Sequence, residues 1–227
     1  MKSYTFGIVS EGPTDFQLMT SIIAKLVPGE HRYRLIQPDL SETPGLGAPS
    51  GVRHSNGWRG VLSWCEAATT GISIYELMEG TSIDVLIIQA DAEIAREPEL
   101  DCARPCPEAE DTVIVLEGII REKLNIEAFD SRIICCIPSD NTEAWVLVAL
   151  DDELMHHGAD KFIECVHKPD EIVSKPPFNA IGRKAGKAKK RQSEYRDKCV
   201  PPVVEKWDYV RSHCHQAEKF HKSIVQL

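Results

Sequence analysis

The sequence predicts an α/β fold, in which helices sandwich a central parallel sheet of about four strands. Segments with the composition of buried strands alternate four times with segments of helical period, and such alternation is typical of βαβ units. The segment Ile83–Gln89 is continuously apolar rather than apolar at every second position. This pattern indicates a strand that is buried on both faces of a parallel sheet.

The predicted strands are rich in β-branched or apolar residues, and three of them run into a polar turn. Each of the three most apolar ones ends close to acidic residues. The strands are expected at Tyr4–Ser10, Tyr33–Gln37, Ile83–Gln89 and Arg132–Ile137.

Helices are predicted where apolar residues recur at a spacing of three or four. The first, Phe16–Val27, has this period and is ended by Pro28-Gly29, a common helix stop. Pro38–Gly57 has no period and is rich in Pro, Gly and Ser, so we expect a loop, and loops of this length are usually functional or disordered. The other helical segments are expected at Trp58–Ala68, Glu108–Lys123, Ala144–Leu150 and Val203–Val225.

The chain has 227 residues, a formal net charge of −9 and an uneven charge distribution. Its length suggests one domain, or one domain with an appendage. Residues 1–160 hold 11 Lys and Arg against 27 Asp and Glu, whereas residues 161–227 hold 15 against 8. Basic segments attract phosphate, and acidic clusters need cations or a functional reason. We expect an α/β domain over residues 1–155 and a mainly helical, basic C-terminal extension over 156–227 that packs on it.

Composition argues against several classes of protein. The longest apolar runs are far shorter than the roughly 20 residues of a membrane span, and the N-terminus lacks the pattern of a secretory signal. We therefore expect a cytoplasmic protein with no membrane partner. Its eight cysteines are then expected to be reduced thiols. A structural zinc is not expected, because Cys102, Cys106, Cys165 and His213-Cys214-His215 fit no standard zinc module.

Acidic residues follow three of the predicted strands. Glu11 and Asp15 follow the first, Asp91 and Glu93 the third, and Glu143 the fourth. The carboxyl ends of parallel strands share one edge, where ligands of open α/β sheets bind. Asp91 and Glu93, two residues apart, point the same way if the chain is extended there.

Carboxylates that converge without a basic partner repel one another. Raised pKa values are one resolution, and a divalent metal is the one we favour, because Mg²⁺ takes oxygen ligands from a few carboxylates and completes its shell with water and phosphate. The alternative is that acids populate these positions because they suit the N-termini of the following helices.

These motifs resemble a known family. Glu-Gly-Pro-Thr-Asp at residues 11–15, Asp-x-Glu at 91–93 and Ser-x3-Glu at 139–143 are similar to the motifs of the Toprim domain. The closest variant is that of the overcoming-lysogenization-defect (OLD) nucleases and their small standalone relatives. The resemblance covers about residues 4–150, and it implies a compact α/β sandwich that cuts or rejoins phosphodiester bonds with Mg²⁺ or Mn²⁺.

The resemblance assigns roles to the five acids. Glu11 would be a metal ligand or general acid/base, and Asp15 would complete that metal's shell. Asp91 and Glu93 match the family's Asp-x-Asp, and Glu143 matches its late acid. Glu93 departs from the usual Asp and reaches further, which leaves the metal spacing, and activity itself, open. Two metals would activate water on one side and stabilise the leaving oxygen on the other.

The segment RKAGKAKKR supplies a candidate cation and a nucleic-acid surface. OLD-type enzymes carry a lysine in a comparable late position, and Lys187 or Lys189 is expected to be the catalytic one; a solvated basic loop is the alternative. Clustered basic residues also suit contact with a nucleic-acid backbone. The six basic residues are Arg183, Lys184, Lys187, Lys189, Lys190 and Arg191.

Taken with the resemblance, the sequence predicts a nuclease of DNA or RNA. It would work in phage defence or DNA repair, with an ABC-type ATPase on a separate chain as a possible partner. Three alternatives stay open: a catalytically inactive Toprim-like binding module in a complex, a phosphohydrolase of nucleotides, and a zinc-binding structural protein. His54, Trp58 and Arg59 are further candidates for substrate contact.

Overall fold

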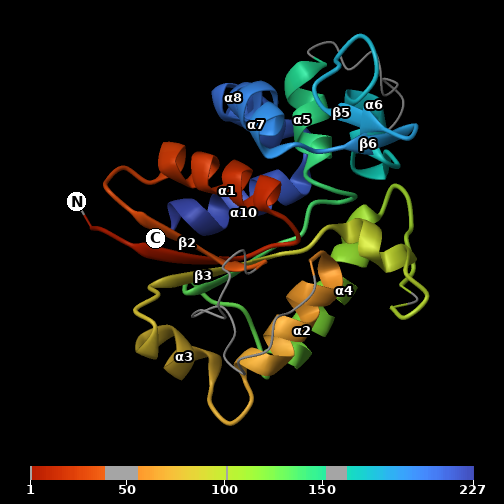
Figure 1. Cartoon of the computed structure of the whole chain (residues 1–227). Helices are drawn as coiled ribbons and strands as arrows, with labels where there is room; N and C mark the ends of the chain where they lie inside the picture. The colour runs from red at the N-terminus through yellow and green to blue at the C-terminus, as the bar shows by residue number, and fades with distance from the viewer. Residues whose placement is uncertain (1, 39–55, 101, 152–162) are drawn as a thin grey trace.

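A computed structural model of the chain describes residues 2–38, 56–100, 102–151 and 163–227. At its centre lies a four-stranded parallel sheet with the strand order β2-β1-β3-β4 (Figure 1). The two central strands, β1 and β3, are almost wholly buried. The predicted α/β class and parallel sheet are thereby confirmed. The strands are β1 (Thr5–Val9), β2 (Arg32–Gln37), β3 (Val85–Gln89) and β4 (Ile133–Cys136).

Helices cover both faces of the sheet (Figure 1). Because side chains alternate along a strand, Ile87 packs on one side with the first group of helices, and Ile88 on the other side with the second. The first group is α1 (Pro13–Leu26), α5 (Glu143–Leu150), α6 (Pro169–Val173), α7 (Gln192–Lys198), α8 (Val200–Glu205), α9 (Trp207–His213) and α10 (His215–Val225). The second is α2 (Trp58–Ala68), α3 (Ile74–Gly80) and α4 (Ala109–Lys123).

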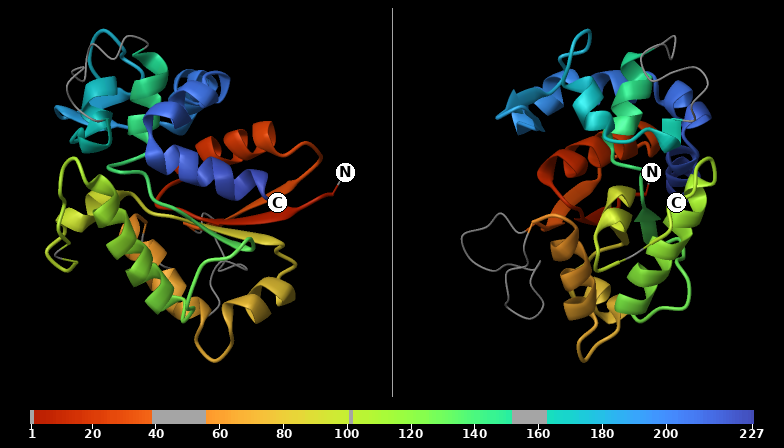
Figure 2. Two further views of the ribbon diagram at one scale, coloured as in Figure 1. Left: turned by 180° about the vertical axis from the view of Figure 1, so that it is seen from behind. Right: turned by 90° about the vertical axis from the view of Figure 1, so that its right-hand side faces the viewer.

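The C-terminal helices belong to the core of the sheet domain. In both views of Figure 2, α10 lies beside α1 on the same side of the sheet. The Tyr4 hydroxyl donates a hydrogen bond to the carbonyl of Leu227, which joins the two ends of the chain. Trp145 on α5 packs edge-on against Trp207, with 5.6 Å between the ring centroids. Residues 163–227 therefore complete one layer of the sandwich.

The expected helical segment Val203–Val225 is three helices, α8, α9 and α10. The breaks lie at Lys206 and at Cys214, whose backbone is extended. The helical spacing of buried residues continues through both breaks, which explains why the pattern indicated one helix. The structure also contains α3, α7 and a basic hairpin of β5 (Gly182–Lys184) and β6 (Lys187–Lys189), which the sequence reading did not predict.

A disulfide joins Cys106 and Cys165, which corrects the expectation of reduced thiols throughout. The loop before α4 folds against a short 3-10 helix, η2 (Ile163–Cys165), and brings the two Cα atoms within 5.8 Å. Because 59 residues separate the two cysteines in sequence, no local spacing revealed the pair. The other six cysteines form no disulfide within the described part of the chain. None of the helices in the described ranges is long and apolar enough to cross a membrane.

Candidate functional site

The carboxyl ends of β1, β3 and β4 meet at one edge of the sheet, and the five predicted acids lie there. Glu11 follows β1, Asp91 follows β3 and Glu143 begins α5. Asp15 lies in the first turn of α1, and Glu93 in a 3-10 helix, η1 (Ala92–Arg96). Each of the five lies within electrostatic range of at least one other. We call this group the acidic cluster.

Glu11 and Asp91 are held by a network that also includes Gln89. A carboxylate oxygen of Glu11 accepts a hydrogen bond from the Asp91 backbone N–H at 2.8 Å. The Gln89 side chain accepts from the Glu11 backbone N–H at 3.1 Å and donates to Asp91 Oδ1 at 2.8 Å. Gln89 is fully buried at the end of β3. The network therefore fixes both acids relative to the sheet.

Asp15 and Glu143 are buried deeper, between α1 and α5. The Thr142 hydroxyl donates to Asp15 Oδ1 at 2.7 Å and lies 3.5 Å from the Tyr195 hydroxyl. Asn141 Oδ1 accepts from the Glu143 backbone N–H at 3.1 Å, at the start of α5. The Glu143 carboxylate is wholly buried, and its Oε1 has no hydrogen-bond donor within the described residues.

Asp91 and Glu93 do not share an extended segment, which corrects the expected geometry. The chain turns into η1 directly after Asp91, so the alternation of a strand no longer applies. Asp91 is buried beside Glu11, whereas Glu93 is partly exposed and lies within range of Asp140, Asp170 and Arg96. Glu93 thus occupies the border of the acidic cluster toward β4.

Burial and repulsion between neighbouring carboxylates raise the pKa values of Glu11, Asp91, Glu93 and Glu143. Burial, and then the charges of Asp15 and Glu93, raise the pKa of Glu11 to about 8, although the hydrogen bond from Asp91 opposes this. Burial raises the pKa of Asp91 well above its usual value, with Glu11 adding to the shift. The pKa of Glu143 is also raised by burial, against the attraction of Lys190. Glu11 therefore holds a proton near neutral pH in the metal-free chain.

Lys190, rather than Lys187 or Lys189, reaches the acidic cluster. Its Nζ lies 2.8 Å from Glu143 Oε2. Burial lowers the pKa of Lys190, but Glu143 and then Asp15 outweigh this and raise it well above its ordinary value. Lys190 directly follows β6 at the base of the hairpin, whereas Lys187 lies beside the turn. Lys187 and Lys189 are exposed and are not brought to the acids.

The other basic residues of the segment divide between structural and exposed positions. Arg183 forms an ion pair with Glu171 at 2.8 Å and donates to the carbonyl of Gly186 within the hairpin. Arg191 pairs with Glu194 at the start of α7. Lys184 is exposed, like Lys187 and Lys189, and none of these three has an ion pair within the described part of the chain.

The start of α2 borders the cluster. The Gly57 backbone N–H donates to the carbonyl of Glu11 at 3.0 Å. Trp58 opens α2, where Arg59 stacks on its ring and pairs with Glu99 at 2.6 Å. Trp58 and Arg59, two of the candidates for substrate contact, thus contact each other, and Arg59 also binds Glu99, which follows η1 in the chain. The third, His54, and most of the predicted loop Pro38–Gly57 lie outside the described residues.

The donor chemistry of the cluster suits Mg²⁺ or Mn²⁺. All five side chains offer carboxylate oxygens, the ligands that hard cations take, and the unpartnered Glu143 Oε1 is a buried anionic acceptor. Across the described ranges, however, no three His, Cys, Asp or Glu side chains converge as a ready metal-binding group. Positive charge comes instead from Lys190. Cys106 and Cys165 are bonded to each other and do not offer thiolates for zinc.

Comparison of the chain with models of protein families, with curated proteins and with solved structures finds no match. The resemblance to Toprim domains therefore depends on the acidic motifs and their places after parallel strands.

Sequence reasoning did not identify Gln89, Thr142 or Tyr195. Gln89 carries a signal in retrospect, because it is a polar residue within the most apolar strand, and such a group needs a hydrogen-bond partner when it is buried. Tyr195 lies on α7, far from the motifs in sequence, and nothing local distinguishes it. It packs beside Lys190, with 5.9 Å from Nζ to the ring centroid.

The raised pKa of Glu11 leads to a pH-dependent prediction for the metal-free protein. Its stabilising contribution is complete below the ordinary value of 4.5 and is lost as the pH rises through about 8. Glu11→Gln should therefore gain about 1–3 kcal/mol in the free energy of unfolding, relative to wild type, between pH 5 and pH 8.5. Urea denaturation with a chelator present measures this difference. Glu122→Gln, an exposed change on α4, is the control, and an equal pH dependence of Glu11→Gln and wild type would contradict the assignment.

Proposed function

We propose that this chain is a metal-dependent nuclease that hydrolyses phosphodiester bonds of DNA or RNA. One observation carries the proposal: five carboxylates gather at the carboxyl edge of a parallel sheet with one lysine among them. The pKa values of Glu11, Asp91, Glu93 and Glu143 are raised there. Keeping so many acids together is costly unless a cation or substrate makes use of them. The Toprim-like order of the motifs supports the same activity.

In this proposal, Glu11 and Asp91 hold Mg²⁺ or Mn²⁺, with Asp15, Glu93 and Glu143 around them. The bound metal would activate water and stabilise the charge on the leaving oxygen. In the metal-free chain the pKa of Glu11 is about 8, so Glu11 would release a proton when a metal binds to it near neutral pH. Gln89 holds Glu11 and Asp91 in position, and the partly exposed Lys190 offers an ammonium group to a phosphate at the border of the acidic cluster.

The exposed lysines of the β5–β6 hairpin are the proposed contact surface for the nucleic-acid backbone. Lys184, Lys187 and Lys189 project from a hairpin whose base leads directly to Lys190 and the acidic cluster. Arg183 and Arg191, which the sequence also suggested, are engaged in ion pairs and hold the hairpin and α7 in place.

Replacing the exposed lysines should lower the salt dependence of nucleic-acid binding. Each phosphate contact contributes about 0.9 to the slope of log K against log salt for duplex DNA. Lys187→Ala should reduce that slope by about 1 and the triple change with Lys184 and Lys189 by about 3. Fluorescence anisotropy at several salt concentrations measures it. Lys222→Ala, a change at an exposed residue of α10, should leave the slope unchanged. If the hairpin variants also show the wild-type slope, the hairpin is not part of the interface.

A second candidate function is a catalytically inactive binding module. The absence of a ready three-ligand group among the described residues favours it, and so does Glu93 in place of aspartate. A nucleotide phosphohydrolase would use the same acids. From the resemblance of the motifs alone, we also propose an ATPase partner on a separate chain and a role in phage defence or DNA repair.

A cleavage assay separates these functions. The purified chain is incubated with plasmid, single-stranded DNA, RNA and free nucleotides, in Mg²⁺, in Mn²⁺ and with a chelator. Metal-dependent cutting of a polynucleotide supports the nuclease. Hydrolysis of nucleotides alone would favour the phosphohydrolase, and inactivity on every substrate would favour the binding module.

A further inference from the structure

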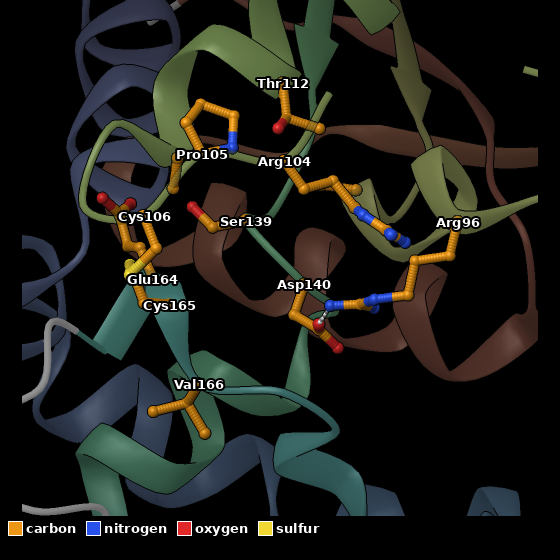
Figure 3. Close-up of a pocket in the computed structure, with 12 residues that line it drawn as sticks. Arg96, Arg104, Pro105, Cys106, Thr112, Ser139, Asp140, Glu164, Cys165 and Val166 are labelled. Carbon is orange, nitrogen blue, oxygen red and sulfur yellow. Dashed lines mark hydrogen bonds and ion pairs between the residues drawn. A yellow bond between two sulfur atoms is a disulfide. The ribbon is translucent and has the colours of Figure 1, made fainter. Parts of the chain in front are cut away.

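A polar cavity lies beside the acidic cluster, on the β4 side. Its volume is about 70 Å³, several times the roughly 10–15 Å³ that one water molecule needs. Figure 3 shows it between η1, the loop before α4, the turn after β4 and the chain around η2. The side chains that matter here are Arg96, Arg104, Ser139 and Asp140.

Two arginines face this cavity, and only one of them is neutralised. Arg96 lies 2.5 Å from Asp140 Oδ2, and its side chain stays 34% exposed. Arg104 is exposed and has no ion pair within the described part of the chain. In Figure 3 both guanidinium groups extend over the same space above Asp140. Like charges that converge in this way repel one another unless an anion joins them.

The cavity also holds an unused hydroxyl group. Ser139 Oγ is buried and has no hydrogen-bond partner among the described residues, although buried polar groups are normally paired. The neighbouring Thr112 hydroxyl is occupied, because it donates to the carbonyl of Ala103 at 2.8 Å. Ser139 therefore has a donor available for a ligand in the cavity.

The acids that line the cavity already have partners. Asp140 faces Arg96, accepts from the Lys168 backbone N–H at 3.3 Å and lies 3.7 Å from His167. Glu164 Oε1 accepts from the Gln216 backbone N–H at 3.0 Å. The positive charge of Arg104 is thus left for an incoming group.

Backbone hydrogen bonds connect the cavity to the acidic cluster. The Glu93 N–H donates to the carbonyl of Asp140 at 2.9 Å, and the Ala92 N–H donates to that of Pro138 at 3.0 Å. Arg96, at the end of η1, lies within electrostatic range of the Glu93 carboxylate. A ligand that spans both sites would follow the carboxyl edge of the sheet from β3 to β4.

We propose that this cavity binds a phosphate group of the polynucleotide and positions the strand for the acidic cluster. Arginine suits phosphate because its planar fork donates two parallel hydrogen bonds, and Ser139 adds a hydroxyl donor. The inference rests on the proposed nuclease function, which supplies the strand. The bound group is either a terminal phosphate or an internal one, since both present the same oxygens.

Calorimetric titration of inorganic phosphate into the metal-free protein, without reductant so that the Cys106–Cys165 bond is kept, tests the cavity separately from catalysis. Arg104→Ala should weaken binding about tenfold, the value of one charge-assisted hydrogen bond, and Ser139→Ala about threefold. Arg32→Ala changes an exposed arginine at the start of β2, at the edge of the sheet away from the cavity, and this variant should bind phosphate like wild type. Unchanged phosphate affinity in both cavity variants would overturn the proposal.

Oligonucleotides with phosphorylated or hydroxyl ends, titrated with a chelator present, identify the source of the phosphate. If Arg104→Ala removes a preference for phosphorylated ends, the group is terminal; if it weakens all oligonucleotides alike, the group is internal. A third result would overturn the positioning role: Arg104→Ala weakens the binding of inorganic phosphate but leaves the affinity for every oligonucleotide unchanged. Failure of the nuclease proposal shows separately, as cavity binding that persists in a chain that cuts no polynucleotide.

Discussion

Lys190→Met is expected to destabilise the metal-free protein by about 2–4 kcal/mol at pH 8.5, because it leaves Glu143 buried without its cation. The loss should be smaller at pH 6. Removing the ammonium raises the pKa of Glu143 further, so the carboxyl is protonated at low pH and its contribution to stability is lost as the pH rises. Urea denaturation at the two pH values measures both effects.

A double-mutant cycle makes this prediction specific. Glu143→Gln removes the charge that Lys190 balances, so adding it to Lys190→Met should restore most of the lost stability at pH 8.5. Lys187→Met, an exposed change in the same hairpin, should be nearly neutral. If the double variant is no more stable than Lys190→Met, the Lys190–Glu143 pair is not the source of the effect.

Glu11→Gln and Asp91→Asn are each expected to lower metal-dependent cleavage by about 10²–10⁴-fold, the usual contribution of a positioned acid or base. Both substitutions keep the size of the side chain, and a glutamine at position 11 still accepts the hydrogen bond from the Asp91 backbone. The fold should therefore persist, which circular dichroism and thermal unfolding confirm. Rates are compared under single-turnover conditions in Mg²⁺ and in Mn²⁺.

Glu122→Gln is the matched control for these two variants, since it removes an exposed carboxylate on α4. It should cleave at the wild-type rate. Cleavage within twofold of wild type by Glu11→Gln and Asp91→Asn would remove both residues from the proposed site.

The places of the acids were predictable because the sheet is parallel. Once Glu11, Asp91 and Glu143 follow three strands of such a sheet, topology brings them to one edge. The direction of the Glu93 side chain was not predictable, because the chain leaves extended geometry at Asp91 and enters η1.

Long-range partners could not be read from the sequence. Lys190 is one of four lysines in the basic segment, and the register of the hairpin decides which of them meets Glu143. The Cys106–Cys165 bond and the contact of Tyr195 with Thr142 also depend on tertiary folding. The helix α3 did have a local signal, the capping box of Ser73 and Glu76.

Metal binding by the chain alone tests the central claim most directly, because it does not depend on a partner or on the right substrate. Mn²⁺ is titrated at pH 8.5, where deprotonated carboxylates favour metal binding, into wild type, Glu11→Gln, Asp91→Asn and Glu122→Gln. We expect wild type and Glu122→Gln to bind Mn²⁺ stoichiometrically, and the two cluster variants to bind at least tenfold more weakly. Equal affinity in all four proteins, or no binding by wild type, would contradict a divalent-metal site at the acidic cluster.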